Sequence, residues 1–158
     1  MQEPAVEILL VEDNPNDVDL ALHALKKNKL VNQVQIVRNG EEALDYIFCK
    51  GEFAARNIND LPKLILLDLK LPKVNGIEVL RQIKANPLTK NIPVVVLTTS
   101  REEQDVTDTY NLGVNSYILK PVDFDQFVDS VRQVGFYWLL LNQYPMQPNK
   151  CDRNTERA

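Results

Sequence analysis

Short aliphatic runs alternate along this chain with longer segments in which apolar residues recur every three or four positions. The runs at 64–67 and 94–97 are aliphatic at every position, which is typical of strands buried on both faces of a parallel sheet. A carboxylate, Asp68, closes the first of them. We predict five strands, at 6–11, 34–37, 64–68, 94–97 and 116–119.

A segment with helical periodicity follows each predicted strand. The first places Val18, Ala21 and Leu25 on one face. Ser100 with Glu103 predicts a capping box for the fourth helix, and Asp123 with Gln126 opens the fifth. Five strands alternating with five helices predict an α/β fold with a doubly wound, five-stranded parallel sheet.

The length of 158 residues fits one domain. We expect that domain to span residues 1–145, with an extended last helix, and residues 146–158 to form a flexible polar tail. The polar segment at 50–62 is long for a connection between a helix and a strand. It is either an interaction loop or a plain surface insertion.

Charge and composition exclude several classes of protein. A net charge of −4 gives no electrostatic footprint for nucleic acid. The N-terminus lacks the features of a signal peptide, and no apolar stretch approaches membrane-spanning length, so we expect a cytoplasmic protein without membrane contact. Cys49 and Cys151 lie far apart without a CxxC motif, which indicates neither a zinc site nor a disulfide framework.

Polar residues that suit ion and phosphate chemistry follow four of the predicted strands. The carboxyl ends of parallel strands meet at one edge, so we expect these side chains to converge. Three carboxylates held close together repel one another unless a cation neutralises them, and magnesium suits an open site of oxygen ligands. Each residue alone has an ordinary explanation as a cap or a strand former, but their combination favours a magnesium site. The residues are Glu12, Asp13, Asp68, Thr98 and Lys120.

These motifs resemble the response-regulator receiver domains of two-component signalling, which share the CheY-like, flavodoxin-like fold. The resemblance runs from about residue 6 to residue 134. Its motifs are Val11-Glu12-Asp13-Asn14, Leu66-Leu67-Asp68 with Leu71-Pro72 and Gly76, Val96-Leu97-Thr98, and Tyr117-Ile118-Leu119-Lys120-Pro121.

The resemblance implies a role for each residue at the strand ends. Asp68 would be the phosphoacceptor, assisted by Lys120 and Thr98. Asp13, Asp68 and the backbone carbonyl of Lys70 would bind Mg²⁺ directly, and Glu12 would act through a coordinated water. The protein would accept its phosphoryl group from a sensor histidine kinase, and self-phosphorylation and autodephosphorylation would depend on magnesium.

The resemblance also implies a conformational switch. After phosphorylation the Thr98 hydroxyl would turn toward the phosphoryl group, and Tyr117 would rotate into the space that it leaves. Such a change is a population shift between two packings. The alternative is that Tyr117 is a half-buried strand residue without a switching role.

Large apolar residues surround the end of the last predicted helix, at Phe136, Tyr137, Trp138 and Leu140. One face can pack on the domain, and the exposed remainder is typical of an interface. We expect a homodimer with two-fold symmetry, the commonest arrangement. Alternatively, the segment at 50–62 closes over these residues as a small second core.

This aromatic end, with Tyr144-Pro145, the long loop at 50–62 and Leu97-Thr98-Thr99-Ser100, is similar to the small response regulators paired with cyanobacterial phytochromes. That resemblance implies a phytochrome as phosphodonor and a homodimer as the working form.

Other classes fit less well. A haloacid dehalogenase-type phosphohydrolase needs a second acid two positions after its nucleophile, where this chain has Lys70. A flavodoxin-like cofactor binder needs a phosphate loop where this chain has Glu12 and Asp13, which would repel phosphate. A receiver-like scaffold that binds partners without phosphorylation remains the alternative function.

Overall fold

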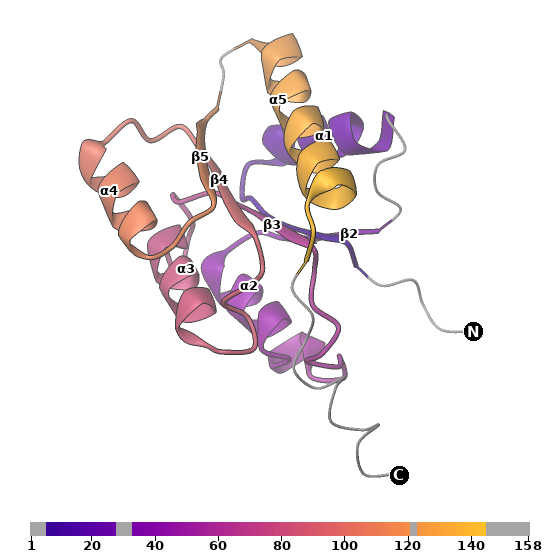
Figure 1. Ribbon diagram of the computed structural model, residues 1–158, viewed down its shortest axis with the longest axis vertical. Coiled ribbons are helices and arrows are strands. Elements are labelled where there is room, and N and C mark those ends of the chain that lie inside the picture. The colour runs from indigo at the N-terminus through magenta and orange to yellow at the C-terminus, as the bar shows by residue number, and fades with distance from the viewer. Residues whose placement is uncertain (1–5, 28–32, 121–122, 145–158) are drawn as a thin grey trace.

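Five parallel strands form one sheet in the computed structural model, which describes residues 6–27, 33–120 and 123–144 (Figure 1). The strand order is β2-β1-β3-β4-β5, so the doubly wound fold is confirmed. The first strand starts two residues later than predicted, and the fourth includes Thr98. The strands are β1 (Ile8–Val11), β2 (Val34–Val37), β3 (Leu64–Leu67), β4 (Val94–Thr98) and β5 (Ser116–Leu119).

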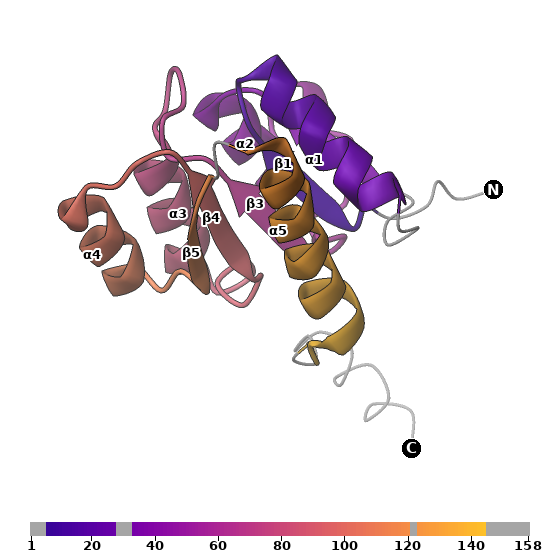
Figure 2. The same cartoon turned by 90° about the horizontal axis from the view of Figure 1, so that it is seen from above.

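Helices cover both faces of this sheet (Figures 1 and 2). One face carries α1 (Pro15–Lys27) and α5 (Phe124–Phe136), which pack against each other. The opposite face carries α2 (Gly40–Ile47), α3 (Gly76–Ala85) and α4 (Glu103–Asn111). The central strands are therefore buried on both sides, which explains why their sequences are uniformly aliphatic.

Alternate residues of each central strand belong to two separate cores. Leu9 and Ile65 pack in the core under α2 and α3, whereas Ile8 and Leu64 pack in the core under α1 and α5. The register of β1 on β3 pairs Ile8 with Leu64 and Val11 with Leu67, so both strands end at the same level. This register aligns the residues that follow them.

Asparagine and aspartate cap three of the helices. Asn39, Asn75 and Asp123 each accept a hydrogen bond from the backbone N–H three residues further on, and for Asp123 that donor is Gln126, as predicted. The capping box predicted at Ser100 is wrong. Helix α4 begins at Glu103, so its N-cap is Glu102, which makes no side-chain cap bond.

The segment at 50–62 folds onto α2. It contains a short 3₁₀ helix, η1 (Gly51–Phe53), and the Arg56 guanidinium donates to the Asp60 carbonyl at 2.7 Å. That guanidinium also lies 3.8 Å from the centre of the Tyr46 ring. Phe53 packs against the core under α2 and α3.

The chain continues past α5 as a π-helical turn, η2 (Tyr137–Leu141), in which the Asn142 N–H donates to the Tyr137 carbonyl at 2.8 Å. Trp138 and Leu139 pack on the core under α1 and α5, the face opposite to that which holds Phe53. Phe53, from the segment at 50–62, and Trp138 are therefore not members of one shared core. The predicted polar tail lies outside the described residues.

None of the helices in the described part of the chain combines the length and apolar character needed to span a bilayer.

Candidate functional site

The residues that follow β1, β3 and β5 extend the sheet by one backbone hydrogen bond each. The Glu12 N–H donates to the Val37 carbonyl at 3.0 Å, and the Asp68 N–H donates to the Val11 carbonyl at 3.1 Å. The Lys120 N–H donates to the Thr98 carbonyl at 2.8 Å. These bonds fix the starting points of the three side chains at one edge, where open α/β sheets bind their ligands.

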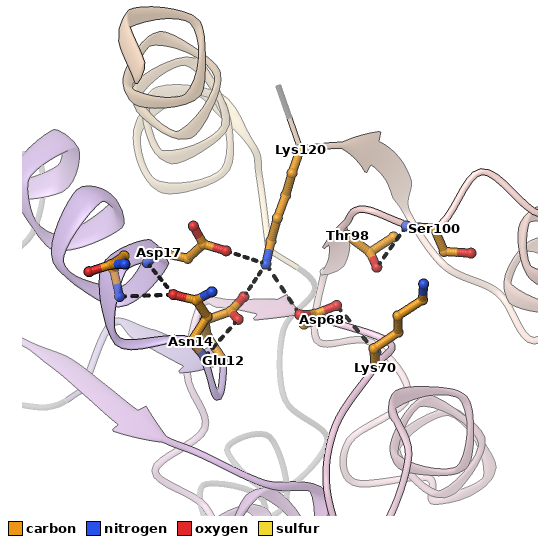
Figure 3. A network of polar contacts seen from close by, with 9 residues as sticks. Glu12, Asn14, Asp17, Asp68, Lys70, Thr98, Ser100 and Lys120 are labelled. Carbon is orange, nitrogen blue, oxygen red and sulfur yellow. Dashed lines mark hydrogen bonds and ion pairs between the residues drawn. The ribbon is translucent and has the colours of Figure 1, made fainter. Parts of the chain in front are cut away.

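The Lys120 ammonium lies at the centre of this edge (Figure 3). Its Nζ is 2.6 Å from Glu12 Oε2, 2.8 Å from Asp17 Oδ2 and 3.2 Å from Asp68 Oδ2. The side chains of Lys120 and Glu12 are each only 5% exposed. An ammonium has three N–H donors, so each can serve one carboxylate.

Burial and ion pairing oppose each other at these groups. Burial lowers the pKa of Lys120, but its hydrogen bonds to Asp17 and Glu12 outweigh this effect, so the pKa lies above its ordinary value. Burial raises the pKa of Glu12 to about 7, although the hydrogen bond from Lys120 acts in the opposite direction. Lys120 therefore stays charged, whereas Glu12 titrates near neutral pH.

Three of the acidic side chains form a group that could hold a metal ion. Glu12, Asp13 and Asp68 each offer a carboxylate oxygen, and these oxygens lie within 4.8 Å of one another. A set of carboxylate oxygens suits a hard divalent cation such as Mg²⁺ or Mn²⁺. Asp13 is exposed, whereas Glu12 and Asp68 are buried, so the group is open on one side.

Lys70 meets Asp68 through its backbone. The Lys70 N–H donates to Asp68 Oδ1 at 3.2 Å, while the side chain is exposed. In Figure 3 the Lys70 side chain extends on the Thr98 side of Asp68, and no dashed line reaches its ammonium. Asp68 therefore has one oxygen toward Lys120 and the other toward the loop that follows β3.

A hydroxyl and an aromatic residue meet at the loop after β4. Thr98 is fully buried, and its Oγ1 accepts a hydrogen bond from the Ser100 N–H at 3.3 Å. The Tyr117 hydroxyl donates to the Ser100 carbonyl at 2.9 Å. The Ser100 hydroxyl bonds the Asp105 carboxylate of α4, so this loop joins Thr98, Tyr117 and α4.

Asp17 was missed by the sequence analysis. It lies in the first turn of α1, and the backbone N–H groups of Asn16 and Asp17 donate to the Asn14 side chain at 2.9 and 3.2 Å. An acid in the first turn of a helix is ordinary, because it favours the positive end of the helix dipole. The available signal was its position, four residues after Asp13, in the first turn of the helix that follows β1.

The predicted interface residues lie away from this edge, at the opposite end of α5 (Figure 1). Phe136 is 47% exposed, Tyr137 is 50% exposed and Leu140 is 57% exposed. Trp138 differs, because it is partly buried against the core under α1 and α5.

Comparisons with known proteins give a consistent result. Residues 8–132 match the family described as the response regulator receiver domain. The probable methanogenesis regulatory protein FilR2 of Methanothrix harundinacea is 42% identical over 138 residues, which cover 87% of this chain and 86% of that protein. The response regulator Rcp1 of Synechocystis sp. is 42% identical over 136 residues, which cover 86% of this chain and 90% of that protein.

Solved structures show the same likeness. The phosphorylated cyanobacterial phytochrome response regulator RcpA superimposes with a TM-score of 0.83 at 42% identity, over 90% of this chain and all of that one. The Mn²⁺-bound form of Rcp1 superimposes with a TM-score of 0.82 at 41% identity, again over 90% of this chain and all of that one.

Proposed function

The chain belongs to the family of response regulator receiver domains, and from that premise we propose that it accepts a phosphoryl group on Asp68 and signals through the resulting conformational change. The observation that carries the proposal is the environment of Asp68. Its carboxylate is buried beside one ammonium, Lys120, and two further acids, Glu12 and Asp13. A structural salt bridge would not need two additional acids at the same point.

The proposed reaction is a displacement at phosphorus. One oxygen of the ionised Asp68 carboxylate forms a bond to the phosphorus of a phosphohistidine. The P–N bond breaks, and the histidine ring keeps the bonding electron pair. The products are an acyl phosphate on Asp68 and a free histidine, so this chain supplies the nucleophile and an electrostatic environment for the transferring group.

Lys120 and the acidic group divide the charge stabilisation. Glu12, Asp13 and Asp68, with the backbone carbonyl of Lys70, would hold a divalent cation, which we propose to be Mg²⁺. When bound, that cation neutralises negative charge on the phosphoryl oxygens. Lys120 Nζ, now 3.2 Å from Asp68 Oδ2, is close enough to donate to a phosphoryl oxygen attached there. The same groups would serve self-phosphorylation by small donors and autodephosphorylation.

We propose Thr98 and Tyr117 as the switch. The Thr98 hydroxyl now accepts from Ser100, which leaves its own proton free for a phosphoryl oxygen. The Tyr117 hydroxyl bonds the carbonyl of the same Ser100, so a movement of Thr98 changes the support of Tyr117 and of α4. These hydrogen bonds support a conformational change that spreads from the site through the loop after β4.

We propose a sensor histidine kinase as the phosphodonor, and a phytochrome within that class. The likeness to RcpA and Rcp1 supports this choice. FilR2 has the same identity to this chain, 42%, but its name does not mention a phytochrome. Phosphotransfer from a panel of autophosphorylated kinases is therefore the deciding measurement. Transfer that is fastest from a phytochrome kinase supports the choice, and preference for another kinase contradicts it.

We further propose a homodimer through the end of α5 and η2. Four large apolar side chains there are exposed: Phe136, Tyr137, Leu140 and Leu141. A second copy of this chain presents the same patch and can cover it about a two-fold axis.

Intact mass after incubation with Mg²⁺ and acetyl phosphate tests the phosphoacceptor. The wild-type protein should gain the mass of one phosphoryl group, and Asp68→Asn should gain none. Asp60→Asn, which changes an exposed acid in the segment at 50–62, is the matched control and should be labelled like wild type. Equal labelling of Asp68→Asn would contradict the assignment, and an unlabelled wild type would favour the phosphorylation-independent scaffold.

A further inference from the structure

We propose that Asp17 is a positioning residue that competes with the phosphoryl group for Lys120. In the unphosphorylated protein it would hold the Lys120 ammonium toward α1, and it would release one N–H when the phosphoryl group arrives. This inference rests on the proposed function, because it concerns the same site.

The first support is the number of donors. Lys120 Nζ has three N–H groups, and Glu12, Asp17 and Asp68 lie within hydrogen-bond distance of it. An incoming phosphoryl oxygen therefore finds no free donor on this ammonium. Phosphorylation removes the carboxylate charge of Asp68 and so frees one donor for the phosphoryl group, and a second donor from Lys120 requires the release of Glu12 or Asp17.

The second support is the difference between the three acids. Asp17 Oδ2 lies 2.8 Å from Lys120 Nζ, whereas Asp68 Oδ2 lies 3.2 Å from it. The hydrogen bond to Asp17 is therefore the stronger of these two. The side chain of Asp17 is 24% exposed, whereas that of Glu12 is 5% exposed. Water can solvate a released Asp17 carboxylate but not a released Glu12 carboxylate, so of these two acids Asp17 is the one that releases Lys120.

The third support is the place of Asp17 in the fold. It lies outside the group of Glu12, Asp13 and Asp68 that could hold a metal ion. Figure 3 shows Asp17 reaching Lys120 from α1, on the side away from Thr98. Its negative charge therefore opposes an anionic phosphoryl group at Asp68 without helping to hold the cation that would neutralise that group.

The exchange involves no net proton transfer. A hydrogen bond from Lys120 to Asp17 breaks, a hydrogen bond from Lys120 to a phosphoryl oxygen forms, and the lysine stays an ammonium throughout. The first turn of α1 would lose its tie to the site in the same event.

Phosphorylation kinetics with acetyl phosphate test the competition. Asp17→Asn should lower the half-saturating donor concentration by about fivefold, the factor expected for one partly exposed charge interaction, with little change in the maximal rate. Asp17→Glu keeps the charge and should behave like wild type. Asp19→Asn, which removes an exposed acid from the same helix, is the matched control and should also behave like wild type.

NMR of lysine ammonium groups in the metal-free protein provides a readout that needs no phosphorylation. The Lys120 signal, assigned by its loss in Lys120→Met, should shift in Asp17→Asn and stay in place in Asp19→Asn. The proposal is overturned if Asp17→Asn matches Asp19→Asn in either measurement, or if it raises the half-saturating concentration. Labelling of Asp68→Asn would instead overturn the proposed function, so the two failures are distinguishable.

Discussion

Lys120 links the chemistry of the site to its electrostatics. A buried ammonium is tolerated only with partners, and here three carboxylates provide them. The same contacts hold acids together that would otherwise repel one another. Any change in the charge of Glu12, Asp17 or Asp68 therefore acts on the other two through this one lysine.

The raised pKa of Glu12 predicts a pH-dependent metal affinity. Burial raises this pKa to about 7, and a divalent cation favours the ionised carboxylate, so binding below that pH releases a proton. The affinity for Mn²⁺ or Mg²⁺ should rise by up to tenfold per pH unit below about pH 7 and level off above it. Calorimetry in buffers of different ionisation enthalpy measures both the affinity and the proton release.

Glu12→Gln should flatten this profile, while Glu103→Gln, an exposed acid on α4, should keep it. The raised pKa of Glu12 has the opposite pH dependence in its effect on the stability of the metal-free fold. A raised carboxyl pKa contributes stability below the unfolded value of about 4.5, and this contribution is lost as the pH rises through about 7. If the metal affinity of the wild-type protein depended on pH as little as that of Glu12→Gln, Glu12 would not be the group that controls metal binding near pH 7.

At the scale of elements, two helices begin with glycine where the loop after β3 passes closely. A Cβ atom on Gly40 would lie 1.8 Å from the Val74 carbonyl oxygen, and one on Gly76 would lie 2.3 Å from the Asp68 carbonyl oxygen. The Gly40 N–H also donates to the Pro72 carbonyl at 3.3 Å. The starts of α2 and α3 thus clamp the loop that carries Asp68 and Lys70.

Gly76→Ala should move this loop. The added methyl group meets backbone atoms of Asp68 and Leu69, so we expect a loss of about 1–3 kcal/mol in the free energy of unfolding. Metal affinity should fall as well, because Asp68 shifts with its backbone. Gln82→Ala, at an exposed position of α3, is the control. Denaturant unfolding and metal titration measure the two effects, and unchanged values for Gly76→Ala would show that the loop is not clamped.

At the scale of the whole molecule, α5 connects two ends with different characters. It begins near the polar edge that holds Lys120, and it continues into η2, where apolar side chains are exposed. It also packs along α1, which carries Asp17. The proposed dimer surface is therefore joined to the proposed phosphorylation site by one helix and its neighbour.

Replacing Phe136 and Leu140 together with Gln should convert the proposed dimer into a monomer. These residues are four positions apart and both exposed, so the change removes apolar surface without disturbing the core. Trp138 is unsuitable for this test, because it packs on the core of its own chain. Light scattering measures the mass, and Leu88→Gln, at an exposed apolar residue elsewhere, should leave it unchanged. An unaltered mass for the double variant would exclude this surface.

The sequence by itself determined the order of the elements and the edge of the sheet where the site lies. Uniformly aliphatic strands occur where both faces are buried, and parallel strands bring their following residues to one edge. Glu12, Asp68 and Lys120 could therefore be brought together without coordinates. The cap at Asp123 was also local enough to be predicted from the sequence.

The tertiary structure alone decided which side chains contact one another across the elements. The ion pair between Asp17 and Lys120 depends on how the first turn of α1 faces the residue that follows β5, and no periodicity in the sequence encodes that distance. The packing of Trp138 inward and the exposure of Phe136 depend likewise on how the end of α5 and η2 meet the core under α1 and α5. Sequence patterns fix which face a residue occupies, whereas contacts between distant segments follow from the packing of whole elements.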